Sequence, residues 1–272
     1  MFKLLRADFY RALRYKVFWV LLAGNALLGF IAVLNAYSFY VNFGPQYNAF
    51  YAMQQGLGGG CGLLGILSAI IISVFIGHEY AAGGMRNKIM TGGGRVRVYL
   101  SKLVLSCGMC VLVYLSFHAM NFVFGSVLLG WEGVPAGQIL LTLLAGLMFT
   151  LAYACIFTAV GMLSKSTVAG LLIGILGTLV MAFAVMYLQG ELGGYYGHDP
   201  ADPEGAVFYP CEWPMWLQNL ARGFIALIPT GQSLTFAEPV IGNLGTYCAL
   251  SCLWIALSAV GGSALFCRVD MK

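Results

Sequence analysis

Long runs of apolar residues separated by short polar segments dominate the chain. No formal charge occurs between Lys16 and Glu79, and four further uncharged runs cover 103–131, 133–164, 166–190 and 239–267. A helix needs about 20 apolar residues to cross the roughly 30 Å hydrocarbon core of a bilayer. The first run is long enough for two crossings and each of the others for one. The pattern therefore predicts six transmembrane helices, over residues 17–40, 58–77, 103–129, 138–163, 167–189 and 244–266.

The composition agrees with a membrane protein and excludes the other broad classes. Hydrophobic residues make up 60% of the 272 residues and charged residues only 9%. A soluble domain has about 25% charged residues, so too few are present to cover a water-exposed surface. Disordered chains combine low hydrophobicity with high charge, which is the opposite of this sequence. We therefore expect an all-α polytopic membrane protein, with residues 1–272 forming one transmembrane domain.

The basic residues are distributed unevenly between the predicted connecting segments. Segments 1–16, 78–102, 164–166 and 267–272 contain 13 of the 14 Lys and Arg residues, and the opposite side of the membrane has only Arg222. Cytoplasmic segments are enriched in Lys and Arg. This bias predicts that both termini are cytoplasmic, that 190–243 is extracellular, and that the net charge reflects topology rather than nucleic-acid binding.

Two segments outside the spans have helical patterns. In residues 1–16, an apolar stripe of Phe2, Leu5, Phe9 and Leu13 predicts an interfacial helix in contact with membrane lipid, and a basic flank that only sets orientation is the alternative. Within 190–243, apolar residues recur at helical spacing over 213–228. This stretch is too short to span and contains Arg222, so we expect a re-entrant or interfacial helix.

Several sequence matches to catalytic or ligand-binding motifs lack the required context. Gly60, Gly62 and Gly65 fit G-x-G-x-x-G, but they lie in a predicted span, where small residues permit close helix contacts. A second such face is expected at Gly170, Gly174 and Gly177. Cys107 and Cys110 form C-x-x-C inside a span without a second pair, and no metal site is expected. No Walker A motif occurs, so the chain has no phosphate-binding loop of its own.

The few ionisable groups within the spans limit the alternative functions. His118 and Asn121 share a helix face in the third span, where interhelical hydrogen bonding is the favoured interpretation. An intramembrane enzyme would need His118 and is one alternative. Ion-coupled carriers usually place charged residues within the membrane. A carrier or channel is the second alternative, although the spans offer little to support it.

The segment 78–102 contains two groups of polar residues around glycines. Glu79, Tyr80, Gly83, Met85 and Arg86 form the first group, and Arg95, Tyr99 and Lys102 form the second. In these residues the chain resembles the permease subunits of bacterial ABC-2-type ABC transporters. Gly84 and Gly94 depart from the Thr and Ser that are usual in that family. The six-span layout with a basic N-terminal helix is consistent with the same family.

The resemblance implies a non-catalytic permease of an ATP-driven exporter in the bacterial plasma membrane. A second permease, identical or homologous, would complete the path, and two separate ATPase subunits would bind ATP and Mg²⁺. A coupling helix within 78–102 would dock into the ATPase, with a smaller contact at 164–166. The implied coupling residues are Glu79, Tyr80, Arg86, Asn87, Lys88, Arg95, Tyr99, Lys102, Ser164 and Lys165.

The apolar spans favour an amphipathic cargo, such as a peptide, a drug or a lipid-like molecule. Scattered polar residues of the spans are the candidates for contacts along the path. These are Asn25, Asn35, Ser68, Ser73, Asn121 and Thr150.

Overall fold

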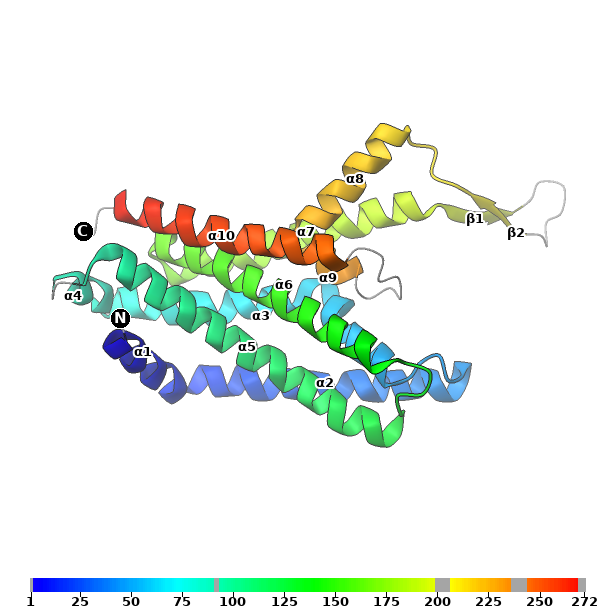
Figure 1. Ribbon diagram of the computed structural model, residues 1–272, viewed down its shortest axis with the longest axis horizontal. Helices are drawn as coiled ribbons and strands as arrows, with labels where there is room; N and C mark the ends of the chain where they lie inside the picture. Colours follow the sequence, from blue (N-terminus) through cyan, green and yellow to red (C-terminus); the bar gives the residue numbers. More distant parts are fainter. Residues whose placement is uncertain (1, 91–92, 199–205, 236–243, 269–272) are drawn as a thin grey trace.

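A computed structural model describes residues 2–90, 93–198, 206–235 and 244–268 of the chain (Figure 1). In these residues the fold is helical except for one short β-hairpin. The elements are α1 (Phe2–Arg14), α2 (Lys16–Phe43), α3 (Ala49–Ala81), α4 (Gly84–Met90), α5 (Arg95–Leu128), α6 (Ala136–Ser164), α7 (Thr167–Gly193), β1 (Tyr195–His198), β2 (Ala206–Tyr209), α8 (Met215–Leu227), α9 (Pro229–Thr235) and α10 (Leu244–Arg268).

Six helices, α2, α3, α5, α6, α7 and α10, are long and apolar enough to cross a membrane. This confirms the prediction of an all-α polytopic membrane protein with six spans. The six helices are longer than the predicted spans. At 1.5 Å per residue the 34-residue α5 is about 51 Å long, well beyond the hydrocarbon thickness. Much of the segment predicted as a connecting loop, 78–102, therefore belongs to the ends of α3 and α5.

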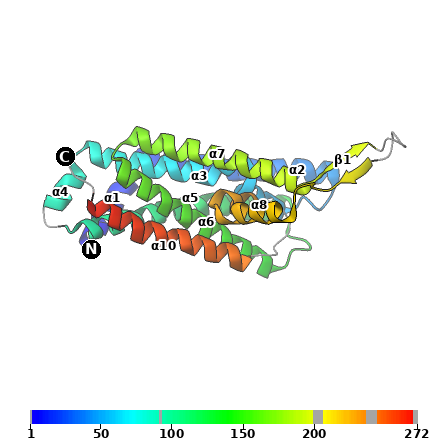
Figure 2. The same ribbon diagram turned by 90° about the horizontal axis from the view of Figure 1, so that it is seen from above.

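The bundle has two distinct ends (Figures 1 and 2). Helices α1 and α4 and the last turns of α10 lie at one end, which we call the α4 end. The β-hairpin projects from the opposite end, which we call the hairpin end. The hairpin was not predicted, since two four-residue strands give too short a pattern to recognise. Its strands are antiparallel, with Tyr195 opposite Tyr209.

Close helix contacts occur at some of the predicted glycines. A Cβ atom at Gly174 of α7 would lie 2.6 Å from the Cβ of Ala69 on α3, and one at Gly65 would lie 2.9 Å from the Tyr153 ring of α6. These glycines let α3 pack directly against its neighbours. Gly177 departs from the prediction, because nothing lies within 4 Å of its Cβ position. Gly60 and Gly62 lie outside the residues whose packing is described.

The helix expected over 213–228 is present as α8, and it continues into the short α9 after Ile228. Helix α9 is buried in the bundle against α3, α6 and α7. Its Thr230 Oγ1 accepts a hydrogen bond of 2.7 Å from the Tyr153 hydroxyl of α6. Ser251 of α10 donates to Gln232 Oε1 of α9 at 2.7 Å. Helices α8 and α9 thus form a helical segment whose chain returns into the bundle, as a re-entrant segment does.

Candidate coupling site at the α4 end

The turn between α3 and α4 depends on Gly83. Its φ of +68° lies in the left-handed region, which favours glycine. The N–H groups of Ala82 and Gly83 donate to the carbonyls of His78 and Tyr80, which closes the last turn of α3. The chain then starts α4 at Gly84 in a new direction. This turn brings α4 back across the bundle end, so that one of its faces is buried.

Four charged residues from four helices meet at the buried face of α4. We call them the ionic cluster: Asp8 of α1, Glu79 of α3, Lys88 of α4 and Lys102 of α5. Lys88 Nζ lies 2.6 Å from Asp8 Oδ1 and also pairs with Glu79 Oε1. Lys102 Nζ lies 3.0 Å from Asp8 Oδ2 and also pairs with Glu79 Oε2. Each lysine therefore pairs with both carboxylates.

The ionic cluster is almost fully removed from solvent. The Lys102 side chain is 0% exposed, and those of Asp8, Glu79 and Lys88 are 9% exposed or less. Buried charges are tolerated when they are paired, and here two anions balance two cations. At its edge, Arg11 Nη1 lies 3.7 Å from Glu79 Oε1 and is half exposed. The cluster thus fixes the positions of α1, α3, α4 and α5 relative to one another.

The electrostatic environment keeps the members that lie outside the spans charged. Burial alone would raise the pKa of Asp8, but the nearby Lys102 and Lys88 hold the pKa below its ordinary value. Burial would lower the pKa of Lys88, yet its hydrogen bonds to Asp8 and Glu79 raise that pKa above the ordinary value. Both side chains are therefore ionised at neutral pH.

Three further predicted residues also point into the bundle and tie it together. The Tyr80 hydroxyl donates to the Met162 carbonyl of α6 at 2.8 Å. The buried Tyr99 hydroxyl donates to the Ser258 carbonyl of α10 at 2.7 Å, and Arg95 Nη1 donates to the Cys267 carbonyl at 2.6 Å. Through these bonds α3 is linked to α6, and α5 to α10.

The remaining predicted residues lie on the outer side of α4 and on the α6–α7 turn. Arg86 and Asn87 are exposed on α4, opposite the cluster face. Lys165 is exposed at the α6–α7 turn, where its φ of 55° ends α6, and Ser164 beside it is half-buried. Arg86 and Lys165 line a groove of about 570 Å³, which we call the α4 groove. Its other lining residues are Gly77, Tyr80, Ala81, Gly83, Met85, Ser166, Thr167 and Val168.

Asp8 is the member of the ionic cluster that was absent from the predicted site. The predicted N-terminal helix is present as α1, whose buried side contains Asp8 and Ala12, whereas Leu13 is 44% exposed. The side chain of Phe2 lies outside the described residues. A signal was present in the sequence: Asp8 is the single acid among the basic residues of 1–16, and it lies one turn from Leu5 and Ala12.

The polar residues expected along a cargo path do not gather around one cavity. Asn25 of α2 donates to the Val113 carbonyl of α5 at 2.7 Å, and Thr150 bonds to its own helix at the Gly146 carbonyl. Asn35 is exposed on α2, and Ser68 and Ser73 are buried along α3. Asn121, by contrast, lines a cavity between α5 and α6. Within one chain, the structure therefore brings only Asn121 of this set to the wall of that cavity.

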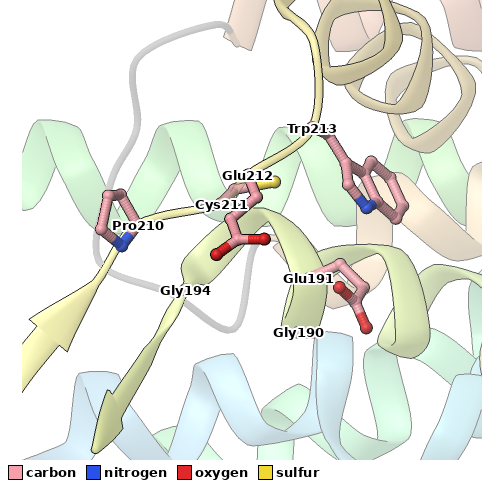
Figure 3. Close-up of a pocket in the computed structure, with 7 residues that line it drawn as sticks. All are labelled: Gly190, Glu191, Gly194, Pro210, Cys211, Glu212 and Trp213. Carbon is pink, nitrogen blue, oxygen red and sulfur yellow. The ribbon is translucent and has the colours of Figure 1, made fainter.

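The hairpin end has a separate pocket of about 330 Å³, where α7 runs into β1 and β2 runs toward α8 (Figure 3). Glu191, Cys211, Glu212 and Trp213 contribute side chains to it. Among the described residues, no group of three or more His, Cys, Asp or Glu side chains is arranged to hold a metal ion. Cys107 of the C-x-x-C pair lies with its Sγ 3.7 Å from that of Cys155 on α6, within the bundle.

The comparison with known families agrees with this architecture. Residues 4–183 match the family described as ABC-2 family transporter protein. The match begins in α1 and includes α3, α4 and α5, so all four residues of the ionic cluster lie inside it. No curated protein matches the chain. Because the family match covers well over half of the sequence, the chain belongs to the ABC-2 transporter family and is a membrane permease of an ABC transporter.

Proposed function

We propose that this chain is the non-catalytic permease subunit of an exporter driven by separate ATPase subunits, and that these subunits bind at the α4 groove. The observation that carries the proposal is the division of α4 into two faces. Its inner face holds Lys88 in the ionic cluster, and its outer face presents Arg86 beside Lys165. A helix held so firmly on one side and exposed on the other is suited to transmit a force.

The distribution of charge supports a cytoplasmic position for the α4 end. The described residues grouped there include 12 of the 14 Lys and Arg residues of the chain, and cytoplasmic segments are enriched in Lys and Arg. Both termini would then be cytoplasmic, in a bacterial plasma membrane, and 190–243 would be external. ABC ATPases bind ATP and Mg²⁺ in the cytosol, so the groove would face the compartment in which they are found.

Coupling would follow from the rigidity of the cluster. When an ATPase subunit moves against Arg86 and Lys165, α4 cannot shift alone, since Lys88 ties it to α1 and α3. Lys102 passes the same displacement to α5. Helices α3 and α5 would therefore tilt together with α4, which is a rigid-body change of the kind used in domain movements. Two permeases and two ATPases would provide the two halves of such a gate.

The direction and cargo of transport are part of the proposal. The spans expose large apolar side chains and bury mainly neutral polar residues, which suits an amphipathic peptide, drug or lipid-like molecule better than an ion. We expect export, because the resemblance is to exporter permeases. The buried Asn25, Ser68, Ser73 and Thr150 would contact cargo only through a conformation or a partner that opens the bundle around them, whereas Asn35 is already exposed on α2.

The test is recruitment of an ABC ATPase that is co-expressed with the chain. The variants Arg86→Glu and Lys165→Glu reverse charges at the α4 groove, and Arg222→Glu makes the same change on the exposed face of α8. We expect the double variant R86E/K165E to reduce copurified ATPase at least tenfold and to abolish stimulation of ATP hydrolysis by the permease. Arg222→Glu should leave both unchanged.

Equal recovery of ATPase with the double variant and with wild type would overturn the docking assignment. Because both substituted residues are on the surface, the thermal unfolding temperature of the purified variant should match wild type. A variant that unfolds early is replaced by Arg86→Gln with Lys165→Gln, for which we expect a smaller reduction in the same direction.

A further inference from the structure

A cavity of about 340 Å³ opens between α5 and α6. The second half of α5 and the first half of α6, which line it, lie in the half of the bundle nearer the hairpin end (Figure 1). We call this cavity the leucine pocket. Its lining comes mainly from the second half of α5 and the first half of α6, with one residue each from α3 and the α5–α6 loop. The lining residues are Met53, Tyr114, Leu115, His118, Ala119, Asn121, Phe122, Trp131, Leu140, Leu143, Leu144 and Leu147.

The mouth of the leucine pocket is apolar and lies on the outer surface of the two spans. Leu115 is 51% exposed, Phe122 59% and Leu140 59%. In a membrane such side chains contact lipid tails, so a molecule could enter sideways from the bilayer. Every residue that lines the pocket is uncharged or is histidine. A charged ligand group would have no counter-charge there and would be costly to bury.

The inner wall of the pocket has two polar side chains, each with one atom that lacks a hydrogen-bond partner. His118 and Asn121 lie three residues apart on α5 and are 7% and 1% exposed. Within the described residues, His118 Nδ1 and Asn121 Oδ1 have no hydrogen-bond partner. Leaving a buried polar atom without a partner is unfavourable, and such a group calls for an explanation.

Neighbouring contacts fix the direction in which these groups can bond. Asn121 Nδ2 donates to the Gly29 carbonyl of α2 at 3.3 Å, which leaves its oxygen as the available acceptor. The Tyr114 ring lies 4.3 Å from the His118 ring, and the Tyr114 hydroxyl is already bonded to the Leu143 carbonyl. A neutral imidazole also has one acceptor nitrogen. The pocket therefore offers hydrogen-bond acceptors at the base of an apolar cavity.

We propose that the leucine pocket binds a neutral amphiphile, whose apolar body lies among the leucines and whose hydroxyl or amide N–H donates to His118 or Asn121. The inference rests on the proposed transport function in one respect, since it identifies this amphiphile as the cargo class. A plain hydrocarbon would fill the cavity but leave the two polar atoms without partners. An amphiphile with one donor group fills the apolar part of the cavity and supplies a partner to one of the two polar atoms.

The test uses purified permease in lipid nanodiscs without any ATPase. Two diazirine probes are compared, a long-chain fatty alcohol and the matching alkane that lacks the hydroxyl. After irradiation, labelled peptides of α5 and α6 are measured by mass spectrometry. We expect the alcohol to label these peptides about fivefold more than the alkane, the ratio that one net hydrogen bond provides.

Two substitutions at the base of the leucine pocket and one in its wall separate the contribution of the hydrogen bond from that of the apolar cavity. His118→Leu and Asn121→Leu should reduce labelling by the alcohol toward that by the alkane. Leu143→Trp should reduce labelling by both probes, because it fills the cavity. Asn42→Leu removes an exposed amide of α2 outside the pocket and should change neither. If either base variant fails to fold, the two-probe ratio on wild type and the Leu143→Trp variant still test the pocket.

Equal labelling by the two probes, or an unchanged ratio in folded His118→Leu, would overturn the assignment. The result is independent of ATPase docking. If the ATPase is recruited through the α4 groove but the probes do not distinguish the pocket, the pocket proposal fails and the transport function stands. If the probes label as expected but no ATPase is recruited, the pocket stands as a binding site and its cargo role fails with the proposed function.

Discussion

Lys88 on the short helix α4 and Asp8 on the N-terminal helix α1 form a buried ion pair, with Nζ 2.6 Å from Oδ1. The two residues are 80 positions apart in the sequence. The pair joins an amphipathic helix outside the six spans to the helix that we propose contacts the ATPase. Helix α1 is thus part of the structure that holds α4 in place. Its role is therefore not limited to setting the orientation of the chain in the membrane.

Replacing Asp8 with Asn should strongly destabilise the purified permease. The substitution removes one of the two carboxylates of the ionic cluster, so the Glu79 carboxylate faces two buried lysines. Breaking a buried ion pair by removing one partner costs about 3–5 kcal/mol. We expect a clear drop in the thermal unfolding temperature in detergent. Glu132→Gln makes the same change at an exposed acid near the other end of the bundle and should have little effect.

A compensating variant distinguishes charge imbalance from a simple loss of packing. In Asp8→Asn with Lys88→Gln, one anion and one cation are removed, so the remaining Glu79 and Lys102 balance each other. The double variant should be more stable than Asp8→Asn alone, with a positive coupling between the two sites. Additive destabilisation by the two substitutions would contradict the arrangement of the ionic cluster.

The pH dependence of unfolding should report on the same residues. The pKa of Asp8 in the folded chain is below its ordinary value of 3.8, so its stabilising effect is present above that value and is lost as pH falls through the folded pKa. The pKa of Lys88 is above its ordinary value of 10.5, so its contribution is present below that pH and is lost as pH rises through the folded pKa. Wild type should therefore lose stability at both extremes, whereas Asp8→Asn should show a smaller loss on acidification. If wild type and Asp8→Asn lost the same amount of stability on acidification, Asp8 would not be paired in the folded chain.

The long elements of the fold could be predicted because the bilayer imposes a strong pattern. Uncharged runs of sufficient length identify each of α2, α3, α5, α6, α7 and α10. The ends of the helices could not be located in this way. The charges of Glu79 and Lys102 predict a connecting loop, because charged residues usually lie outside the spans, yet both residues continue the helices α3 and α5. A charge can lie within a helix when partners from other helices neutralise it.

The candidate site could be predicted in part. The resemblance in 78–102 identified Glu79, Lys88 and Lys102, but it gave no information on which residues point inward. That direction depends on the turn at Gly83, which decides which face of α4 meets the bundle. Asp8 was missed because its partners are distant in the sequence. The sequence marks Asp8 as an isolated acid in a basic segment, but it does not indicate which distant lysines the carboxylate pairs with.

The contact between α3 and α7 provides a test of helix packing that does not involve charge. Gly174→Ala adds a Cβ that would lie 2.6 Å from the Cβ of Ala69, so the helices must separate. We expect destabilisation of about 1–3 kcal/mol, the usual cost of overpacking. Gly177→Ala makes the same substitution on the same helix with nothing within 4 Å, and its stability should match wild type to within about 1 kcal/mol. Similar unfolding temperatures for the two variants would show that α7 does not pack on α3 in this way.

The proposed sidedness can be measured by thiol labelling of intact cells with a membrane-impermeant maleimide. Cys211 lines the pocket at the hairpin end, so wild type should be labelled from outside and Cys211→Ser should not. Met90 is 63% exposed at the end of α4. In the Cys211→Ser background, Met90→Cys should react only after the membrane is permeabilised, because we expect α4 to lie in the cytoplasm. Labelling of Met90→Cys in intact cells would place the α4 groove outside, where no cytosolic ATPase could reach it, and would overturn the proposed coupling even if the fold is correct.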